Sequence, residues 1–554
     1  MKNSKFQIPN FKFILVFFII LLAAVLRLWN LEKYPAGLNA DEAAIGYNVY
    51  SLILTGKDEH GASWPLHFKS FADYKPGGYF YIVLPFVKIL GLNELAVRLP
   101  SALLGTLAVL GIFLLVKELF GSPNLALIAS FFLAVSPWHI HFSRGGWETN
   151  AASSFILFGV YLFLKSLKNP KLFPFSFLLF TFSLYTYHSA RVVAPLLGLA
   201  LVIFYRKEVF SRVTLKNFLI GGLVAFLISI PLLVDFFGPA GTARFSGLSV
   251  FSDVGPYSLV LSLRGEHKNY NDLFSRVLHN RPVVYGLQFL RNYLSFFDGN
   301  FLFVIGDRVE RSNSPNMGEL YFLDLLFLIF GIYFFLKKRP KNWQIPFIWL
   351  LIAPVAGALT FQVPSALRAH NMVFPLVIIS AYGFWNILLF LKNKSKLIPI
   401  PLYPYIPIFL IIFFIWNIFY FFHQYFVHYP KTYPAAWEYG FKDLVRYIEP
   451  IKDNYAKIYI TEKYDQPYIL FLFYLKYSPQ KFQQEAVLTP RDKFGFSTVR
   501  DFANFHFENI KWEELKGQRN ILVCGTKEEM PEGEKITKII NFPNNQPAFI
   551  CVEK

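Results

Sequence analysis

The sequence predicts an all-α membrane protein that spans the bilayer about eleven times and ends in a small α/β domain. Three observations predict this class. Of the 554 residues, 54% are hydrophobic and 16% are charged, with a mean hydropathy of +0.39, which is too apolar for a water-soluble chain of this length. Apolar runs as long as a membrane span recur up to residue 422. After that point, charged helical stretches alternate with short β-like runs.

The expected membrane spans come from a search for about 20 consecutive, mostly apolar residues. They cover residues 11–29, 98–116, 125–140, 151–167, 172–185, 192–205, 218–234, 320–336, 345–361, 372–391 and 398–422. No small-residue cleavage site follows the first apolar run, so we expect it to stay as an anchor. The run 79–90 is too short to span and predicts a helix at the membrane surface.

Clusters of Lys and Arg orient the predicted bundle, because cytoplasmic loops are enriched in these residues. The clusters "MKNSKFQIPNFK", "KSLKNPK", "YRKEVFSRVTLK", "KKRPKNW" and "KNKSK" fall in alternate connections. We therefore expect a membrane domain at 1–422 with a cytoplasmic N-terminus, a first external loop at 30–97 and a long external loop at 235–319. Because the number of predicted spans is odd and the N-terminus is expected to be cytoplasmic, we expect residues 423–554 to form an extracytoplasmic domain. The net charge of +18 then requires no nucleic-acid partner.

The polar tail predicts a small α/β domain. The stretch "AAWEYGFKDLVRYIEPI" has a helical pattern, whereas "AKIYITEK", "NILVCG" and "PAFICVEK" have the pattern of strands. The two cysteines of the chain, Cys524 and Cys551, lie here and match no metal-ligand spacing. They can form one disulfide if the domain lies in an oxidising compartment. Acceptor binding and a purely structural cap explain the domain equally well.

Unusual polar residues gather on the side of the membrane that the charge rule makes external. They are Asp41, Glu42, Lys75, Glu94, Arg98, His139, His141, Arg144, Glu148, His188, Arg191, Arg368 and His370. Three arginines, Arg144, Arg191 and Arg368, lie on the predicted external side, where the positive-inside rule expects few of them. Their position indicates that an anion holds them there. A lipid phosphate or pyrophosphate fits, because guanidinium groups bind phosphate oxygens in pairs and keep their charge.

Several of these residues also have an ordinary structural explanation. Asn39 and Glu42 have the spacing of a helix N-terminal capping box. Asp41, in the first turn of the same helix, would complement the helix dipole whatever the protein did. Arg98 can reach the interface or pair with Glu94, four residues earlier.

A phosphate beside carboxylates suggests chemistry as well as binding. A sugar carried on a phosphate already has a good leaving group, which needs charge stabilisation more than a proton donor. One carboxylate that takes the proton of an incoming hydroxyl is then sufficient, and a single displacement inverts the anomeric carbon. Asp41 and Glu42 are the candidate acids. We expect the helix that follows them to lie along the membrane interface, with its apolar side formed by Ile45, Val49, Leu52 and Ile53.

The acidic pair is followed in order by "YKPGGYFY", "ELAVRLPSALLG", "SPWHIHFSRGGWETN", "LYTYHSARVVAPL" and "VPSALRAHNMVFPL". Over roughly 11–422 these segments resemble the phospholipid-carrier-dependent glycosyltransferases of the GT-C superfamily, related to protein O-mannosyltransferases and lipid A aminoarabinose transferases. The resemblance implies a helical bundle whose first external loop carries juxtamembrane helices and the catalytic acid. It also implies a polyprenyl-phosphate sugar donor, a protein, lipid or glycan acceptor at the bilayer, and no cofactor. Whether a divalent metal takes part stays open, and no residue is assigned as a metal ligand.

The resemblance assigns roles to individual residues. Asp41 resembles the family's catalytic base, and Glu42 the acid beside it that binds or positions the substrate. Lys75 matches the basic residue of a Lys-Pro-Pro-Leu segment that meets the donor phosphate, although Gly-Gly replaces Pro-Leu in this sequence. Arg98 matches the arginine of the "RLPS" segment. The other residues expected around donor phosphate or sugar are Arg144, His188, Arg191 and Arg368.

Two other classes of protein share these features. A flippase or transporter of lipid-linked sugars also gathers arginines around phosphate, but transporters place polar groups near the bilayer midplane, where this sequence has few. An O-antigen ligase or polymerase would use the long external loop instead, with His267, His279, Arg281 and Arg308. That loop is rich in aromatic residues and is expected either to cover the acceptor side of the cavity or to lie at the interface as amphipathic helices.

Overall fold

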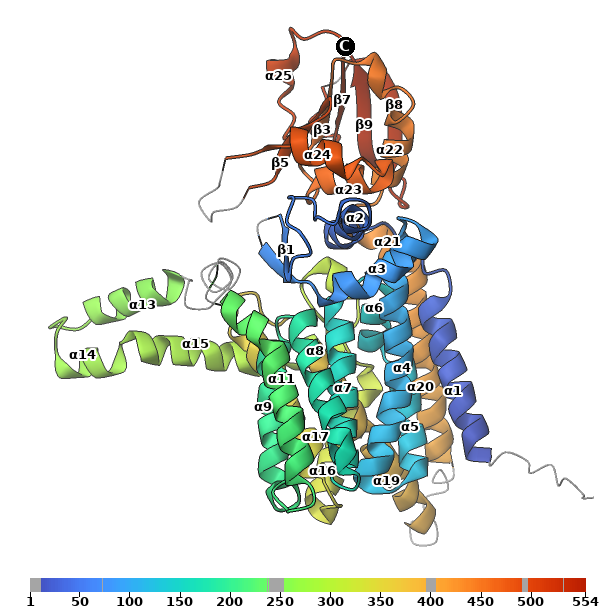
Figure 1. The fold of residues 1–554 in the computed structure, drawn as a ribbon, viewed down its shortest axis with the longest axis vertical. Coiled ribbons are helices and arrows are strands. Elements are labelled where there is room, and N and C mark those ends of the chain that lie inside the picture. Colours follow the sequence, from blue (N-terminus) through green and yellow to red (C-terminus); the bar gives the residue numbers. More distant parts are fainter. Residues whose placement is uncertain are drawn as a thin grey trace, which may run out of the picture.

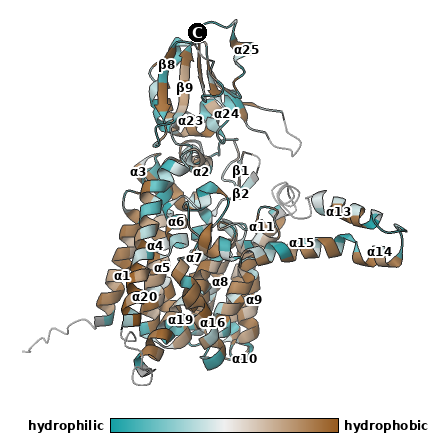
Figure 2. Cartoon of the chain, turned by 180° about the vertical axis from the view of Figure 1, so that it is seen from behind, coloured by the Kyte–Doolittle hydropathy of each residue, from teal (hydrophilic) through white to brown (hydrophobic). Residues whose placement is uncertain are grey.

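The computed structural model describes residues 11–71, 73–236, 238, 254–394, 405–490, 497–531 and 533–554. It consists of a helical bundle with an α/β domain stacked on one end, and the C-terminus lies in the α/β domain (Figure 1). The long helices of the bundle run side by side and are apolar along most of their length (Figure 2). The predicted helical class with a small C-terminal sheet is confirmed.

Each predicted span contains a helix of the bundle. These helices are α1 (Phe11–Leu28), α4 (Glu94–Phe120), α5 (Pro123–Val135), α7 (Glu148–Ser166), α8 (Phe173–Thr186), α9 (Ala190–Phe204), α11 (Leu215–Phe236), α16 (Phe322–Lys338), α17 (Gln344–Ile352), α19 (Val373–Lys394) and α20 (Ile406–His423). By length and apolarity alone, four helices among the described residues can cross a membrane, or five if one bent pair counts as a span. Eleven crossings therefore stay a prediction.

Two predicted spans are interrupted by proline. Instead of one helix over 125–140, α5 ends at Val135 and α6 (Pro137–Arg144) continues at an angle of 55°. Ser136 caps the new helix by accepting a hydrogen bond from the His139 amide at 3.4 Å, and Pro137 lacks the amide hydrogen that a continuous helix would need. The span at 345–361 likewise divides at Pro354 into α17 and the single turn α18 (Val355–Ala358).

The first loop forms a layer between the bundle and the α/β domain. It contains α2 (Ala40–Thr55), a hairpin of β1 (His67–Ser70) and β2 (Asp73–Pro76), and α3 (Gly78–Leu90), which is the short helix predicted at the surface. Both α2 and α3 lie across the end of the bundle (Figure 1).

The expectation that the apolar side of α2 faces the lipid is wrong. Ile45 and Val49, on its apolar side, are fully buried in protein. A Cβ added at Gly46 would lie 2.5 Å from the ring of Phe473 in the α/β domain and 2.9 Å from the side chain of Val97 in α4. Protein, not lipid, therefore covers both sides of α2, and only a residue without a side chain fits at this position.

The α/β domain is built on one seven-stranded mixed sheet with the strand order β4-β5-β6-β3-β7-β9-β8. Its strands are β3 (Lys457–Thr461), β4 (Val487–Leu488), β5 (Val499–Phe502), β6 (Phe505–Glu508), β7 (Ile521–Gly525), β8 (Ile536–Asn541) and β9 (Pro547–Glu553). Strand β3 pairs in parallel with β6 and β7, and the other pairs are antiparallel. The three stretches predicted as strands became β3, β7 and β9.

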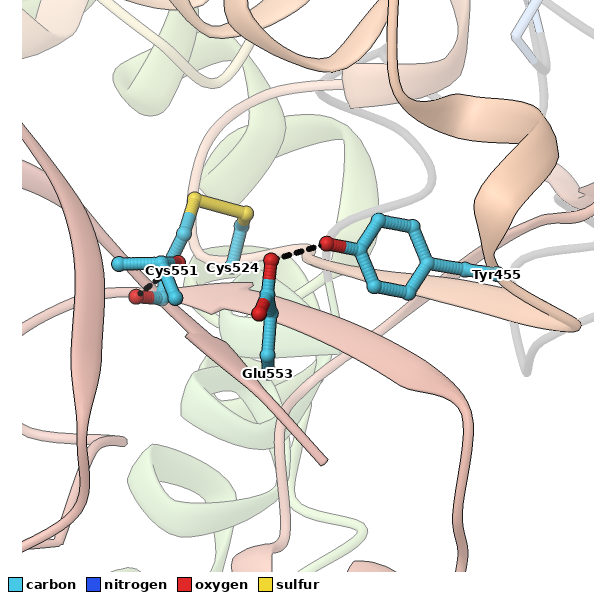
Figure 3. Close-up of a disulfide and its surroundings, with 5 residues drawn as sticks. Tyr455, Cys524, Cys551 and Glu553 are labelled. Carbon is cyan, nitrogen blue, oxygen red and sulfur yellow. Dashed lines mark hydrogen bonds between the residues drawn. A yellow bond between two sulfur atoms is a disulfide. The ribbon is translucent and has the colours of Figure 1, made fainter.

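The described part of the domain also contains the helices α22 (Phe441–Ile448), α23 (Pro467–Leu475), α24 (Pro479–Glu485) and α25 (Trp512–Leu515). Helix α23 is buried between the sheet and α2. The two cysteines face each other on the paired strands β7 and β9 and form a disulfide, beside the hydrogen bond that Tyr455 donates to Glu553 (Figure 3). A disulfide at this place fits an oxidising compartment.

Residues 237 and 239–253 of the loop predicted to be external lie outside the described residues, and the rest of that loop has two parts. Helices α13 (Val254–Gly265), α14 (Leu273–Leu278) and α15 (Arg281–Ser295) project sideways from the bundle, and we call residues 254–295 the lateral arm (Figures 1 and 2). The following segment, with the short turns Asn300–Val304 and Glu310–Ser312, returns to the bundle and packs on α6. This second part carries a side chain into the candidate site.

Candidate active site

Asp41 occupies the first turn of α2, at the end of the bundle that faces the α/β domain. The predicted capping box is present: the Glu42 amide donates to Asn39 Oδ1 at 2.9 Å, and the Asn39 amide donates to Glu42 Oε2 at 3.4 Å. Consecutive helical residues point about 100° apart. The box therefore turns the side chain of Glu42 inward, and Asp41 keeps 26% of its side chain exposed.

Two cations flank the Asp41 carboxylate. Lys75, from β2, forms an ion pair and a hydrogen bond with Oδ1, and its ammonium group lies 5.5 Å from the centre of the Phe71 ring. Arg311 approaches the other oxygen, with Nη2 3.6 Å from Oδ2. A partly exposed carboxylate between two cations from different segments is an arrangement that can both take a proton and bind an anion.

The α/β domain contributes acids to the same cluster. Nη1 of Arg311 lies 3.5 Å from Oδ2 of Asp465, in the connection between β3 and α23. Glu438, in the segment that enters the domain, is buried close enough for its charge to interact with Arg311, Asp465 and Asp41. Burial raises the pKa of Glu438 well above its usual value, with the neighbouring carboxylates adding to the rise and Arg311 opposing it.

Glu42 and Arg98 form a buried clamp. Arg98 binds the Glu42 carboxylate with both Nε and Nη2 at 2.8 Å, and the Gly146 amide donates to the same group at 2.7 Å. The guanidinium group also donates to backbone carbonyls of the loop before α2, including those of Leu31, Pro35 and Gly37. The sequence also allowed an ion pair between Arg98 and Glu94. In the structure Glu94 instead binds Lys442 at 2.6 Å, so that pair does not hold Arg98.

Arg144 forms a second clamp at the end of α1. Its guanidinium group donates to the carbonyls of Leu26 at 2.8 Å, Trp29 at 2.7 Å and Tyr34 at 3.1 Å, and lies 5.2 Å from the centre of the Phe426 ring. These carbonyls belong to the last turn of α1 and the loop after it. Arg98 and Arg144 therefore hold the loop that leads to Asp41 through its backbone carbonyls. A direct role with the donor phosphate would not require these contacts.

His188 and Arg191 support the hairpin that carries Lys75. The ring of His188 hydrogen-bonds the Tyr74 carbonyl at 3.0 Å through Nε2, one residue before Lys75. Arg191 donates to the Leu184 carbonyl at 3.2 Å and contacts His67, in β1. Arg368 is placed by Thr360 and Gln362 of its own loop, at 2.8 Å each.

An apolar cavity of about 330 Å³ lies among α7, α8, α9 and α11. Its walls include Phe177, Phe180, Leu184, Pro195 and Phe226. Leu184 belongs to this wall and its carbonyl accepts a hydrogen bond from Arg191, so the cavity lies next to Arg191, which contacts His67 in the hairpin that carries Lys75.

Sequence reasoning missed three residues of the cluster. Arg311 carried the same signal as the other external arginines, because it runs against the positive-inside trend on the long loop. Glu438 and Asp465 had no such signal, since their position depends on how the α/β domain docks. Within the described parts of the chain, no three His, Cys, Asp or Glu side chains come together as metal ligands would.

Burial of a carboxyl group beneath α2 predicts a pH effect on stability. Glu59 is fully buried, accepts a hydrogen bond from Asn48 at 3.2 Å, and burial raises its pKa to about 8. The folded protein therefore keeps a proton that the unfolded chain loses near pH 4.5, so stability falls as pH rises from about 4.5 to about 8. We expect Glu59→Gln to raise thermal stability at pH 8 and to change it little at pH 4.5. Equal effects at both pH values in melting experiments would contradict a neutral Glu59.

The comparisons identify the class to which this architecture corresponds. Residues 74–234 match the family model described as dolichyl-phosphate-mannose-protein mannosyltransferase. ArnT from Cupriavidus metallidurans matches in its apo state with a TM-score of 0.55 and 11% identity over 98% of each chain. Its complex with undecaprenyl phosphate matches with a TM-score of 0.53 and 11% identity over 97% of each chain.

An oligosaccharyltransferase from Archaeoglobus fulgidus tethered to an acceptor peptide also matches, with a TM-score of 0.50 and 14% identity over 85% of this chain. This chain spans 64% of the archaeal protein's length. No curated protein sequence matches the chain. The fold is that of the GT-C glycosyltransferases, and the resemblance predicted from the sequence is confirmed.

Proposed function

We propose that this protein is a membrane glycosyltransferase that moves a sugar from a polyprenyl-phosphate donor to an acceptor hydroxyl on the outer face of the membrane. The observation that carries the proposal is the partly exposed Asp41 carboxylate held between Lys75 and Arg311. The 330 Å³ apolar cavity beside the Lys75 hairpin supports a donor with a lipid tail. A charged head beside an apolar cavity is what a polyprenyl phosphate requires.

The donor phosphate takes the two cations from Asp41. Lys75 and Arg311 bind its oxygens, as ammonium and guanidinium groups do elsewhere, and the carboxylate is then no longer neutralised by them. Asp465 holds the other side of Arg311, so it competes with the phosphate for the same guanidinium group. Donor binding would thus prepare the base for the acceptor.

The chemical step is a single displacement. The acceptor oxygen forms a bond to the anomeric carbon while the bond from that carbon to the phosphate oxygen breaks. Asp41 takes the proton of the acceptor hydroxyl, and the electron pair leaves with the polyprenyl phosphate, whose charge Lys75 and Arg311 stabilise. Glu42 acts as a positioning residue through Arg98 and the capping box.

The acceptor is a hydroxyl group of a protein, lipid or glycan. The Archaeoglobus fulgidus match carries an acceptor peptide and the ArnT complex carries undecaprenyl phosphate, which supports a carrier-lipid donor and leaves the acceptor class open. The disulfide of the α/β domain supports an extracytoplasmic position for that domain and for the neighbouring Asp41. The N-terminus is then cytoplasmic, as the charge pattern predicts.

The stereochemistry of the product tests the single displacement. With a polyprenyl-phosphate sugar of known anomeric configuration, we expect the product to carry the opposite configuration by nuclear magnetic resonance. Retention of configuration would require a covalent glycosyl-enzyme intermediate and would contradict the role of Asp41 as a base.

The structure disfavours the ligase or polymerase alternative. Three of the four residues on which it depended, His267, His279 and Arg281, belong to the lateral arm, which projects away from the bundle (Figure 1). The loop residue that approaches Asp41 is Arg311. A flippase or transporter would bind the same donors without consuming them, so turnover separates it from the proposal.

Replacing Arg311 tests its part in donor binding. We expect Arg311→Gln to raise the donor KM roughly 10- to 100-fold, because a hydrogen bond to a charged group contributes about 1.5–3 kcal/mol. Asp465→Asn should lower the donor KM, since it removes a competitor for Arg311. Arg308→Gln, at an exposed position three residues earlier, is the matched control. An equal KM for the Arg311 and Arg308 variants in steady-state assays would contradict phosphate binding by Arg311.

A further inference from the structure

The lateral arm exposes a continuous apolar surface. On α15, one side of the helix is formed by residues spaced four, three and four apart, and these are 37 to 56% exposed. They are Val283, Leu287, Leu290 and Leu294. The tip of the arm adds Leu273, Phe274, Val277 and Leu278, which are 53 to 71% exposed. An apolar patch of this extent marks an interaction surface.

The arm is fixed at its base. The side chain of Asn292 donates to the carbonyls of Ala358 at 3.1 Å and Thr360 at 2.9 Å, and the Tyr293 hydroxyl donates to the Leu351 carbonyl at 2.8 Å. These contacts attach the last turns of α15 to the end of α17 and the turn after it. The apolar side of α15 therefore has a set direction relative to the bundle.

Helix α13 covers the opposite side of α15. The guanidinium group of Arg281 lies 4.5 Å from the centre of the Tyr257 ring of α13, and Val260 and Val284 are buried between the two helices. In Figure 1, α13 lies on the side of α15 nearer the α/β domain. The apolar stripe of α15 consequently faces away from the α/β domain, toward the side of the arm on which the bundle helices extend.

The bundle helices nearest the arm also expose apolar side chains. The arm leaves the bundle near the ends of α9 and α11 and runs across their direction (Figures 1 and 2). These two helices expose apolar side chains along their length, including Leu199 and Ile203 on α9 and Leu223 and Leu227 on α11. The outside of these bundle helices and the stripe on the arm are thus both apolar.

The charge of the arm points to the same partner. Residues 254–295 contain five basic and two acidic side chains, the basic ones being Arg264, Lys268, Arg276, Arg281 and Arg291. An amphipathic helix with an apolar side and basic residues binds in the plane of a membrane, and acidic head groups strengthen the binding.

We propose that the lateral arm lies in the membrane interface, in the leaflet on the side of the α/β domain. The stripe of α15 and the tip of α14 are inserted among the acyl chains, and the basic residues contact acidic head groups. This inference concerns anchoring and orientation in the bilayer and does not depend on the proposed activity.

A pair of neighbouring labels tests the depth of the arm. Leu287→Cys places a thiol on the stripe, and Gln288→Cys places one on the half-buried polar side as the matched control. The natural cysteines are joined and buried, so an environment-sensitive NBD dye reacts only with the new thiol. Each labelled full-length protein is placed singly in nanodiscs of phosphatidylglycerol and phosphatidylcholine, with spin-labelled lipids as quenchers.

We expect the label at position 287 to be quenched several-fold more strongly than the label at 288, at a depth of about 5–10 Å below the head-group boundary. The difference should shrink in discs of phosphatidylcholine alone. Equal quenching of the two labels would overturn the inference and favour a partner in water. Protection of position 287 that appears in detergent and grows with protein concentration would overturn it in favour of a second copy of the chain.

Discussion

Asp41→Asn should reduce the rate of sugar transfer by roughly 10²- to 10⁴-fold, the usual contribution of a general base. Asparagine keeps the size of the side chain but cannot accept the proton of the acceptor hydroxyl. It also releases Lys75 and Arg311 from their ion pairs, so the affinity for a polyprenyl-phosphate sugar should be unchanged or higher. Single-turnover kinetics together with direct donor binding separate the two effects.

The control for this variant is Asp443→Asn, at an exposed position on α22 of the α/β domain. Asp443 makes only a surface ion pair with Arg446, and such pairs contribute little. If Asp41→Asn turned over as fast as this control, the role of Asp41 would be to stabilise the start of α2 through the helix dipole. The proposed mechanism would then fail.

Arg98→Met should destabilise the protein by about 3–5 kcal/mol, because it leaves the Glu42 carboxylate buried without its partner. The same change removes the hydrogen bonds that hold the carbonyls of Leu31, Pro35 and Gly37. We expect a lower melting temperature in detergent and a loss of activity that follows from displacement of the start of α2. Arg446→Met is the matched control, since the side chains of Arg446 and its partner Asp443 are 69% and 56% exposed.

A second substitution distinguishes the clamp from a general loss of packing. Removing both charges, in Glu42→Gln with Arg98→Met, should recover part of the stability lost in Arg98→Met, because no unpaired buried charge remains. A double variant that is as unstable as the sum of the single variants would contradict a buried ion pair as the source of the effect.

Local patterns in the sequence were sufficient to predict much of the fold. Apolar length located a helix in each expected span, the Asn39–Glu42 spacing gave the capping box at the start of α2, and alternation located three strands of the final sheet. Each of these features depends on residues close together in the chain. The breaks at Pro137 and Pro354 were not predictable in this way, because Pro100 and Pro231 also lie in apolar runs but inside unbroken helices.

Such local patterns could not predict how distant segments of the chain pack against one another. The apolar side of α2 looks like a surface for lipid until Phe473, more than four hundred residues later, is known to cover Gly46. Arg98 and Arg144 act as clamps by binding backbone carbonyls. Every residue has a backbone carbonyl, so the residue types in the sequence do not indicate these contacts. Arg311 and Asp465 reach Asp41 only because the long loop and the α/β domain meet above it.

The measurement that tests the central claim most directly is consumption of a panel of polyprenyl-phosphate sugars by the purified protein, with isolated membranes as the source of acceptor. The account predicts that at least one of these donors is converted to free polyprenyl phosphate and a glycosylated acceptor, and that Asp41→Asn prevents this while still binding the donor. Binding of the donors by the wild-type protein without consumption of any of them would contradict the account and identify a carrier of lipid-linked sugars instead.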